Sequence, residues 1–496
     1  MEQKAIKLNS ANLSLLSKEV RIPSYDRSKV KTGIVHVGIG GFHRAHQAFY
    51  TEELLENNGV TDWGICGIAL LPQDKRIYDT LAAQDGLYTL MITEADGTTD
   101  ARVIGSIAEY LFAPENPDAV IEKMAHPDIK IITLTITEGG YNFNPATGKF
   151  MSETPAIQSD INNPDQPATI FGYLTQALER RKKRGLKGIT IQSCDNIQQN
   201  GEVAKEMLTA YISLAEPELL NWVAENVSFP NAMVDRITPV TSAEALNQLH
   251  NRFNIDDAWP IVCEPFCQWV IEDNFVNGRP DWNLAGAQFV KDVHPYEKMK
   301  IRLVNGGHVA LGFTGYLAGY SFVYETMADP VFFNFVKDFL NKEVTPILDD
   351  VPGIDVEEYK KTLMQRFANP YIKDQLTRIF SESSAKIPAF LLPTINEQLA
   401  KGAVLKRAAL ILAAWHHYLE LAELPAHKHD IQDEMKQLLA EKATESVQDD
   451  PLAFLKIKSI FGDLAAEEHF SDVYLFFLNR IRNLGVTRVI SAIDEG

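Results

Sequence analysis

Residues 296–308, YEKMKIRLVNGGH, contain four polar side chains whose types and spacing could do chemistry. On an α-helix, at about 100° per residue, Lys300, Asn305 and His308 fall within an arc of roughly 140°. Arg302 lies at the edge of that arc. A cation, an amide and an imidazole on one face could move a proton and hold a substrate oxygen. The same stripe could be a solvated helix surface, so the elements that would position it must decide.

A glycine-rich turn lies near the start of the chain. Residues 33–38, GIVHVG, predict a short buried strand, and residues 42–59 have a helical pattern that ends near Gly59. A strand, a glycine turn and a helix open a dinucleotide-binding βαβ unit, because glycines let the backbone approach a pyrophosphate. The G-x-G-x-x-G pattern would need glycine where the chain has His43. A glycine turn can also simply connect a strand to a helix.

The next predicted strand, residues 63–70, is followed by Pro72, Gln73 and Asp74. An acid after the second strand can accept a hydrogen bond from a ribose 2′-hydroxyl, and it repels a 2′-phosphate. Asp74 is the candidate, although it could instead cap the helix after Pro72. Lys75 and Arg76 could accept the phosphate of NADP, so the sequence favours NAD and leaves NADP open.

Two further strands end in polar residues. Residues 129–137, IKIITLTIT, form a β-branched run typical of a buried parallel strand, and Glu138 follows. After a helix predicted at 168–184, LKGITIQS predicts another strand that leads into Asn196. Ligands of open α/β sheets lie beyond the carboxyl ends of strands, so Glu138 and Asn196 are candidates for a site. The repeated alternation predicts a Rossmann-like, doubly wound parallel sheet.

After residue 295 the strand signals largely vanish, and helical periodicity dominates in DPVFFNFVKDFLNKEV, VLKRAALILAAWHHYLEL and LFFLNRIRNLG. We therefore expect an α/β domain over residues 1–290, with insertions, and a mainly helical substrate-binding and catalytic domain over residues 291–496. Lys300 comes just after this change of pattern, where an inter-domain cleft is expected.

Bulk composition limits the class of protein. The chain has 496 residues, 45% apolar and 23% charged, with a formal net charge of −19. Nucleic acid and anionic membranes need a cationic partner, so small molecules are the expected ligands. Four cysteines are too few for a disulfide framework, and no run of 18 apolar residues is present. We expect a cytoplasmic protein that is neither secreted nor membrane-spanning.

A nucleotide domain followed by a helical domain with a polar cluster at the join suggests a nicotinamide oxidoreductase. Alcohol oxidation needs either zinc or a side-chain base, and no His/Cys ligand set supports zinc. Lysine can be that base only if its pKa falls from about 10.4 to roughly 7–8, which burial and a nearby positive charge favour. Lys300 would be the base, Asn196 and Asn305 would donate to the alkoxide, and His308 would orient the hydroxyl.

The chain resembles the mannitol dehydrogenase family of polyol-specific long-chain dehydrogenases over nearly its whole length. The family pattern K-x-R-x-x-N-x-x-H is met in full by Lys300, Arg302, Asn305 and His308. Further stretches carry the resemblance: VGIGGFHRAHQAFYTEELL, LTITEGGY, SCDNIQQNG, FPNAMVDRITP and EPFCQWVIEDNF. The turn of this family has the pattern G-x-G-G-F-H-R, so His43 agrees with the family pattern.

This resemblance implies zinc-independent oxidation of a secondary alcohol of an open-chain sugar alcohol with NAD(P). It assigns Lys300 as general base, Asn196 and Asn305 as the oxyanion site and His308 to substrate positioning. It implies that Glu297 gates proton exchange, and that substrate hydroxyls contact Asp235, Arg378 and Lys386. The cofactor would bind at Gly38, Gly40, Gly41, Phe42, His43, Arg44, Asp74 and Glu138. Gln73 departs from an acidic residue of some relatives, which leaves strict NAD selectivity open.

The substrate is less defined, because the family also contains hexuronate reductases. A relative that handles uronates places arginine where this chain has Cys267, and a thiol cannot make a bidentate carboxylate contact. This favours a neutral polyol, with D-mannitol and D-fructose as the leading pair. Arabinitol is the next substrate, and fructuronate remains an alternative because Arg302, Arg378 and Lys386 could serve a carboxylate. A non-catalytic nucleotide sensor is a remote alternative, and a monomer is expected.

Overall fold

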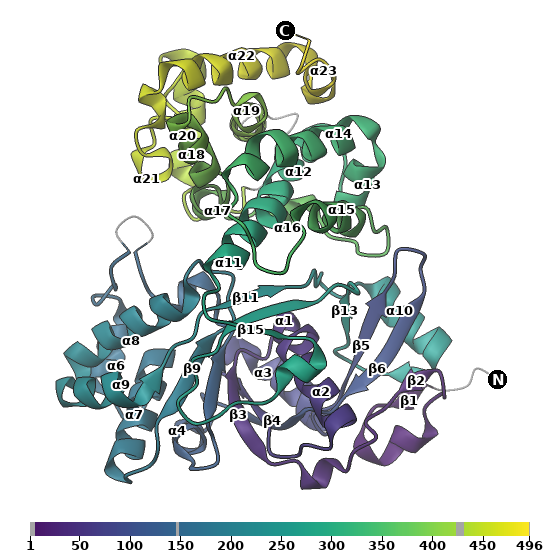
Figure 1. Cartoon of the computed structure of the whole chain (residues 1–496), viewed down its shortest axis with the longest axis vertical. Coiled ribbons are helices and arrows are strands. Elements are labelled where there is room, and N and C mark those ends of the chain that lie inside the picture. The colour runs from purple at the N-terminus through teal and green to yellow at the C-terminus, as the bar shows by residue number, and fades with distance from the viewer. Residues whose placement is uncertain (1–4, 145–147, 423–430, 496) are drawn as a thin grey trace. The chain divides into compact units, whose positions relative to one another are not determined.

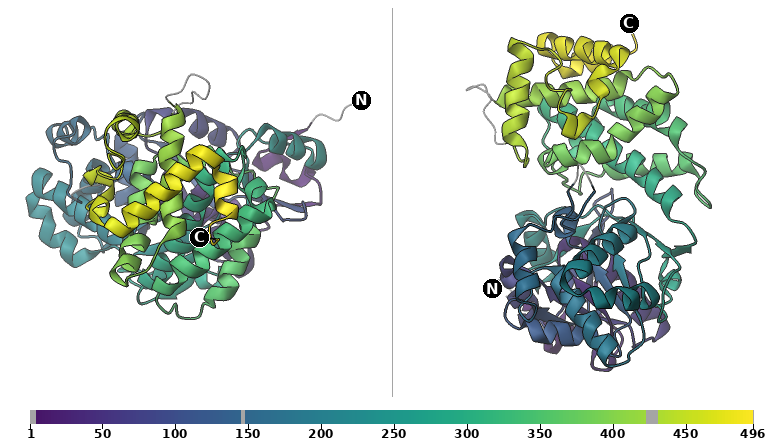
Figure 2. Two further views of the ribbon diagram at one scale, coloured as in Figure 1. Left: turned by 90° about the horizontal axis from the view of Figure 1, so that it is seen from above. Right: turned by 90° about the vertical axis from the view of Figure 1, so that its left-hand side faces the viewer.

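The computed structural model describes residues 5–144, 148–422 and 431–495. The chain forms two compact units, Met1–His294 and Pro295–Gly496, and each is described by itself (Figure 1). The first unit contains the strands, and the second is built from helices, as Figure 2 also shows. The predicted class, a Rossmann-type domain followed by a mainly helical domain, is confirmed.

The largest sheet of the described residues has six strands, all parallel to their neighbours. In spatial order they are β10 (Val227–Ser228), β9 (Ile189–Ser193), β8 (Ile131–Leu134), β3 (Thr32–Val37), β4 (Gly64–Ala69) and β7 (Ile107–Phe112). Numbered along the chain, this is the 3-2-1-4-5-6 order of dinucleotide-binding folds. The order reverses between β3 and β8, so the carboxyl ends of these two strands flank the position where such folds bind a nucleotide.

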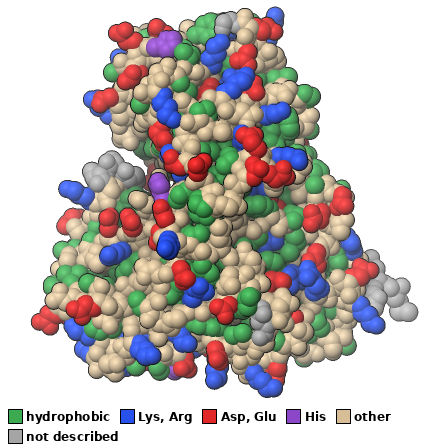
Figure 3. Space-filling model, viewed as in Figure 1, with side chains coloured by type: hydrophobic (Ala, Val, Ile, Leu, Met, Phe, Trp, Pro, Cys, Tyr) green, Lys and Arg blue, Asp and Glu red, His purple; other side chains and the backbone are tan. Residues whose placement is uncertain are grey.

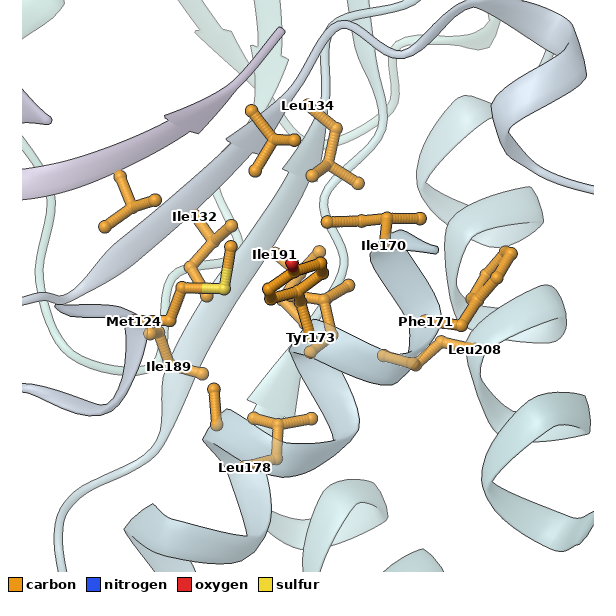
Figure 4. Packing of buried hydrophobic residues seen from close by; sticks show 14 of the residues in the cluster. Met124, Ile132, Leu134, Ile170, Phe171, Tyr173, Leu178, Ile189, Ile191 and Leu208 are labelled. Carbon is orange, nitrogen blue, oxygen red and sulfur yellow. The ribbon is translucent and has the colours of Figure 1, made fainter. Parts of the chain in front are cut away.

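Helices cover both faces of this sheet, because strands that are buried on both sides need apolar cover above and below. On one face, Ile132, Ile189 and Ile191 pack against Tyr173 and Leu208 (Figure 4). The helices of this face include α4 (Pro117–Ala125), α7 (Ile170–Lys183) and α8 (Asn200–Ala215). The opposite face packs against α1 (Gly41–Ala45), α2 (Gln47–Asn58) and α3 (Lys75–Ala83). The helical pattern ends at Gly59, whose φ of 64° closes α2.

Smaller sheets extend the first unit. Strands β13 (Ile261–Cys263), β5 (Tyr88–Thr93), β6 (Thr99–Ile104) and β2 (Val20–Arg21) form one of them. Another contains β11 (Ala232–Asp235), β14 (Gln268–Glu272) and β15 (Gln288–Val290), and β1 (Ile6–Lys7) pairs with β12 (Ile255–Asp256). The remaining α-helices are α5 (Thr137–Gly140), α6 (Pro155–Asn162), α9 (Leu220–Asn226) and α10 (Ala243–Phe253). Short 3-10 helices span Ser10–Leu15, Arg27–Lys29, Pro72–Asp74, Pro217–Leu219 and Trp282–Ala285.

The second unit packs around the apolar helices α12 (Gly306–Leu317) and α19 (Lys406–Ala422), which are almost completely buried. Around them lie α13 (Val323–Ala328), α14 (Pro330–Asp338), α15 (Val356–Phe367), α16 (Leu376–Phe380), α17 (Ser383–Phe390), α18 (Leu392–Ala400), α20 (Lys436–Gln448), α21 (Lys458–Phe461), α22 (Glu468–Leu484) and α23 (Val486–Ser491). Short 3-10 helices span Thr345–Ile347 and Leu464–Ala466. Two π-helical turns, Ile301–Asn305 and Phe339–Val344, continue α11 (His294–Lys300) and α14.

Acidic and basic side chains are interspersed on the face drawn in Figure 3, without a large patch of either sign. Among the described residues, no helix combines the length and the apolar character that crossing a bilayer requires.

Candidate active site

The glycine turn follows β3 at the switch point of the sheet. Gly38 has a φ of 103°, and a Cβ there would collide with the carbonyl oxygen of Thr135, so the position requires glycine. Its carbonyl oxygen accepts hydrogen bonds from His36 Nε2 at 2.8 Å and from the Thr135 hydroxyl at 2.9 Å. A Cβ at Gly40 would meet no atom within 4 Å. The turn is therefore anchored on one side and open above Gly40, which leaves room for a ligand.

His43 and Arg44 point into the protein. The His43 ring stacks on His36 with centroids 3.3 Å apart, and burial lowers the pKa of His36 to about 3, which keeps it neutral at pH 7. Arg44 donates to the Trp259 carbonyl at 2.7 Å. Phe42 is half-buried and stacks on His46 at 5.0 Å. His43 and Arg44 thus pack into the protein interior and support the glycine turn there.

Asp74 lies at the end of a 3-10 helix, and its Oδ2 accepts the backbone N–H of Leu71 at 2.9 Å. Asp74 directly precedes α3, but its side chain caps no N–H group of that helix; it instead closes the preceding 3-10 turn, which uses one of its two carboxylate oxygens. Both neighbouring cations have partners in the protein. Lys75 Nζ contacts Asp79 at 2.5 Å, and the Arg76 guanidinium lies 5.0 Å from the centre of the Trp259 ring.

The ends of β8 and β9 carry the next two candidates. The chain leaves the sheet at Leu134, earlier than the sequence predicted, and Glu138 is exposed on the short helix α5. Asn196 is half-buried and follows Asp195, whose carboxylate accepts the backbone N–H groups of Ile136 and Thr137. No role was predicted for Asp195 from the sequence, although an acid at a strand's carboxyl end is a signal that could have identified it.

Asp235 lies at the end of β11 opposite Gln268 of β14, and only 4% of its surface is exposed. The side chains of Asp235, Arg236 and Tyr50 interact electrostatically with Cys267, and Tyr50 is hydrogen-bonded to the thiol. Burial raises the pKa of Cys267 to about 11, so this group is an uncharged thiol at neutral pH. Arg236 donates to the carbonyl oxygens of Ala45 at 2.6 Å and Glu264 at 3.0 Å. Tyr50 and Arg236 were not singled out from the sequence.

The segment that contains Lys300 is not one continuous α-helix. Lys300 ends α11, and the following π-helical turn ends at Asn305 with a bond from the Gly306 N–H to the Ile301 carbonyl. Residues five apart lie on one face of a π-helix, so Asn305 lies over Lys300. His308 lies three residues further, in α12, and shares this face. The π-helical turn therefore brings Lys300, Asn305 and His308 into a narrower arc around the helix axis than the roughly 140° expected for a plain α-helix.

Arg302 points to a different side of this segment, where its Nη1 donates to the Ala389 carbonyl of α17 at 2.9 Å. Burial lowers the pKa of this guanidinium. Lys300 and Glu297 are 6% and 4% exposed, which excludes the solvated-surface interpretation for them. The Asn305 Oδ1 atom is buried and has no hydrogen-bond partner among the described residues.

Gly306 and Gly307 lie between Asn305 and His308. A Cβ at Gly307 would lie 2.9 Å from the Phe367 ring, and a Cβ at Gly306 would lie 3.7 Å from Phe339. These positions face apolar side chains of the same unit, and Gly307 has no room for a Cβ beside Phe367. The His308 ring stacks on Phe367 with centroids 4.5 Å apart.

Arg378 and Lys386 lie close together although eight residues separate them. Arg378 makes a bidentate pair with the buried Asp374, with both N–O distances at 2.6 Å. Lys386 Nζ donates to the Arg378 carbonyl at 3.2 Å and to the Ile379 carbonyl at 2.9 Å, at the end of α16. Asp374 is thus a further residue of this site that the sequence analysis did not identify.

The predicted site residues fall into groups within the two units. The cofactor candidates, Asn196 and Asp235 belong to the first unit, whereas Glu297, Lys300, Asn305, His308, Arg378 and Lys386 belong to the second. Among the described residues, no group of three or more His, Cys, Asp and Glu side chains is arranged to hold a metal ion.

Comparisons with known proteins cover nearly the whole chain. Family models described as the mannitol dehydrogenase Rossmann domain and the mannitol dehydrogenase C-terminal domain match residues 32–284 and 292–475. A mannitol 2-dehydrogenase of Neosartorya fischeri is 47% identical, with 98% of both chains covered. The solved structure of Pseudomonas fluorescens mannitol 2-dehydrogenase, a ternary complex with NAD and D-mannitol, is 44% identical with a TM-score of 0.92, covering 99% of this chain and all of that one. A D-sorbitol dehydrogenase structure is 37% identical with a TM-score of 0.87, covering 98% of this chain and 100% of the other.

Proposed function

Because the chain belongs to the mannitol dehydrogenase family, we propose that it is an NAD-dependent dehydrogenase that interconverts D-mannitol and D-fructose. The membership confirms the predicted class of enzyme, a polyol dehydrogenase. The observation that carries the proposal within the molecule is the complete K-x-R-x-x-N-x-x-H pattern, whose π-helical turn gives Lys300, Asn305 and His308 one common face.

Lys300 is the general base in this proposal. Its Nζ takes the proton of the substrate hydroxyl, and NAD, when bound, accepts the hydride from the carbon that carries this hydroxyl. A lysine can act in this way only as a neutral amine, which burial and a neighbouring cation both favour. Its 6% exposure supports this role, because burial disfavours the charged form of the amine.

Asn196 and Asn305 hold the oxygen whose negative charge develops as the proton leaves. Amide N–H groups that are already oriented stabilise such an alkoxide without having to rearrange. The buried Asn305 Oδ1 has no protein partner among the described residues, so this acceptor is available to a substrate hydroxyl beside the alkoxide to which the amide N–H donates. His308 orients the reacting hydroxyl, and Glu297, which is 4% exposed, relays the proton between Lys300 and solvent.

Substrate hydroxyls bind Asp235, Arg378 and Lys386. The bidentate pair with Asp374 holds the Arg378 guanidinium in one orientation, and Lys386 is fixed against the end of α16. Fixed donors and acceptors suit an open-chain polyol, because the protein then spends less entropy on binding a flexible molecule.

NAD binds over the turn that begins at Gly38, with Glu138 and Asp74 on the cofactor side. The open space above Gly40 fits this cofactor, because a backbone without side chains lets a pyrophosphate come close. Asp74 keeps one carboxylate oxygen for the ribose. Lys75 and Arg76 are held by Asp79 and Trp259, which supports NAD over NADP.

A neutral polyol is favoured over a hexuronate. Cys267 lies beside Asp235 as an uncharged thiol, and Arg236 is held by two carbonyl oxygens of the protein. A carboxylate at this position would therefore meet the acid Asp235 and an uncharged thiol, and the nearby Arg236 guanidinium already donates to two carbonyl oxygens.

An assay panel tests the proposal. Purified protein is incubated with NAD or NADP and with mannitol, sorbitol, arabinitol or xylitol, and fructuronate reduction is followed in the reverse direction. We expect the highest kcat/KM for mannitol with NAD and formation of fructose. A preference for fructuronate would contradict the polyol assignment, and no activity with any pair would favour the sensor alternative.

A further inference from the structure

We propose that Asp195 is a positioning residue that locks the end of β9 to the end of β8 and thereby fixes the adjacent Asn196. This inference rests on the proposed role of Asn196 as an oxyanion donor. The interactions that carry it lie entirely within the first unit and are independent of the glycine turn and of Asp74.

The Asp195 carboxylate collects three donors. Oδ1 accepts the Thr137 N–H at 2.9 Å, and Oδ2 accepts the Ile136 N–H at 3.0 Å and the Tyr141 hydroxyl at 2.7 Å. A carboxylate can only accept, so Tyr141 donates to it and receives the Ser193 hydroxyl, 2.6 Å away. Asp195 is 8% exposed, and buried bonds of this charge-assisted kind are stronger than neutral ones.

The backbone of Asp195 is fixed as well. Its carbonyl oxygen accepts the Asn200 side-chain amide at 3.0 Å, and the same amide group donates to the Ala232 carbonyl at 2.7 Å. Asn200 Oδ1 in turn accepts the Ala232 N–H at 2.9 Å. Asp195, the residue before Asn196, is therefore held through both its carboxylate and its carbonyl oxygen, and Asn200 also connects it to β11, which ends in Asp235.

Thr137 shows why the end of β8 needs such a partner. Its φ is 61°, in the left-handed region that a β-branched residue rarely adopts. Strained residues of this kind persist only where the surroundings hold them, and they gather at functional sites. The Asp195 carboxylate holds the Thr137 N–H, and the next residue is Glu138, the cofactor-side candidate.

The ionised form of Asp195 is the one that can serve three donors. Burial is the largest cause that raises its pKa, to about 6, and the Glu138 charge acts in the same direction. The Tyr141 hydroxyl and the two backbone N–H groups lower the pKa by bonding to the charged form. Below about pH 6 the carboxyl group takes up a proton and loses acceptor capacity, so positioning weakens as the solution becomes more acidic.

Asp195→Asn tests the proposal, since it replaces one acceptor oxygen with an NH₂ group that faces a donor. We expect kcat for mannitol oxidation to fall about a hundredfold, as misplaced catalytic groups do, with KM for mannitol nearly unchanged. Protonation of the Lys300 base lowers kcat at acid pH in both proteins, and protonation of Asp195 adds a further decrease below about pH 6 in the wild type. We expect Asp195→Asn to lose this additional decrease, so that its pH profile is shallower below about pH 6. A kcat within threefold of wild type, or an equally steep profile below pH 6, would overturn the inference.

Glu343→Gln is the matched control, because the buried Glu343 also accepts two backbone N–H groups, those of Arg407 and Ala408 at 2.8 and 2.9 Å. This carboxylate accepts N–H groups at the N-terminus of α19, and it has no part in the proposed chemistry. We expect its loss to lower the unfolding temperature while kcat per folded molecule stays at the wild-type value. If both variants lost kcat equally, Asp195 would be a structural residue only.

Thr137→Gly provides a rescue. Glycine adopts the left-handed conformation at no steric cost, so it needs less help from residue 195. We expect the Thr137→Gly, Asp195→Asn double variant to regain roughly tenfold in kcat over Asp195→Asn. A double variant no faster than Asp195→Asn would show that the carboxylate does not act through Thr137.

Tyr141→Phe keeps the test decisive if Asp195→Asn does not fold. Removing one donor destabilises the ionised carboxylate, so the additional decrease in kcat that Asp195 causes should begin at a higher pH, while kcat falls roughly fivefold. An onset at the same pH as in the wild type would contradict the inference. Asn196→Ala separates the two proposals. If this variant keeps the wild-type kcat, the proposed role of Asn196 is wrong. If it is inactive while Asp195→Asn is active, only the proposed role of Asp195 is wrong.

Discussion

The two units position their candidate residues by different means. In the first unit, polar residues follow the ends of parallel strands, and hydrogen bonds join one strand end to the next, as Thr135 does for Gly38 and Asp195 for Thr137. In the second unit, Lys300, Asn305 and His308 lie along one continuous helical segment, and the π-helical turn sets their relative direction. Residues at strand ends are positioned by individual hydrogen bonds, whereas residues on a helix are positioned by their angle around the helix axis, here called the helix phase.

This difference indicates how each half should respond to mutation. A strand-end site should lose function when a single hydrogen bond or a single glycine is changed, because each hydrogen bond fixes one residue. A helix-phase site should tolerate surface changes and fail when one residue is inserted. The following changes test that contrast, from the largest expected effect to the smallest.

Inserting one alanine after Val304 should abolish activity. The insertion would place Asn305 six residues after Lys300, and residues six apart on an α-helix lie about 120° from each other, so the two side chains would no longer share a face. We expect a loss of kcat of about 10³-fold or more per folded molecule, with unchanged NAD affinity. Val304→Ala is the control, since it keeps the chain length. Retained activity in the insertion variant would show that helix phase is unimportant.

Gly38→Ala should impair the first unit selectively. A Cβ would collide with the Thr135 carbonyl oxygen, and the φ of 103° suits only glycine. We expect destabilisation by about 2–4 kcal/mol and at least a tenfold rise in KM for NAD. Gly40→Ala, where a Cβ meets no protein atom within 4 Å, is the comparison: a rise in KM for NAD without loss of stability would mark space used by cofactor alone.

Asp374→Asn should weaken substrate binding in the second unit. The bidentate pair that orients Arg378 would be lost, whereas the backbone bonds of Lys386 would remain. We expect KM for mannitol to rise about tenfold with a small change in kcat, because uniform binding is removed. The same variant measured with NAD as the varied substrate should match the wild type, and a selective loss of NAD binding would contradict this assignment.

The pH dependence of stability should show the smallest effect. Burial raises the pKa of Glu343 from 4.5 to about 7. The folded state therefore binds more protons than the unfolded state between these values, so this group makes stability fall as pH rises from about 4.5 to 7. Replacing it by Gln should flatten that decrease by on the order of 1–3 kcal/mol, measured by unfolding at pH 5 and pH 7. An unchanged slope would contradict the assignment.

The sequence predicted those parts of the fold that have local signals. Strands β3, β4, β8 and β9 are apolar runs that end in glycine or polar residues, and their order along the chain places Gly38 and Asn196 at carboxyl ends. The sheet that contains β5 and β13 was not predicted, since these strands pair across about 170 residues of sequence. Pairing at such a distance leaves no periodic signal within either segment.

Side-chain chemistry was predictable where residue types are informative and less so where geometry decides. Lys300 and Asn305 could be singled out by type, but a π-helical turn has no sequence signature, so their common face became clear only from the backbone. Asp195 and Asp374 were missed because each acts through another residue. The predicted domain boundary at residue 290, the site roles and the monomeric state stay predictions.

The central claim is that Lys300 is the base in NAD-dependent oxidation of a polyol. The most direct test is the pH dependence of kcat/KM for mannitol in wild type and Lys300→Ala between pH 6 and 10. We predict that the wild-type value rises with pH as the amine loses its proton, and that the variant is about 10²- to 10⁴-fold slower with no such rise. A variant with near-normal oxidation across this range would contradict the claim.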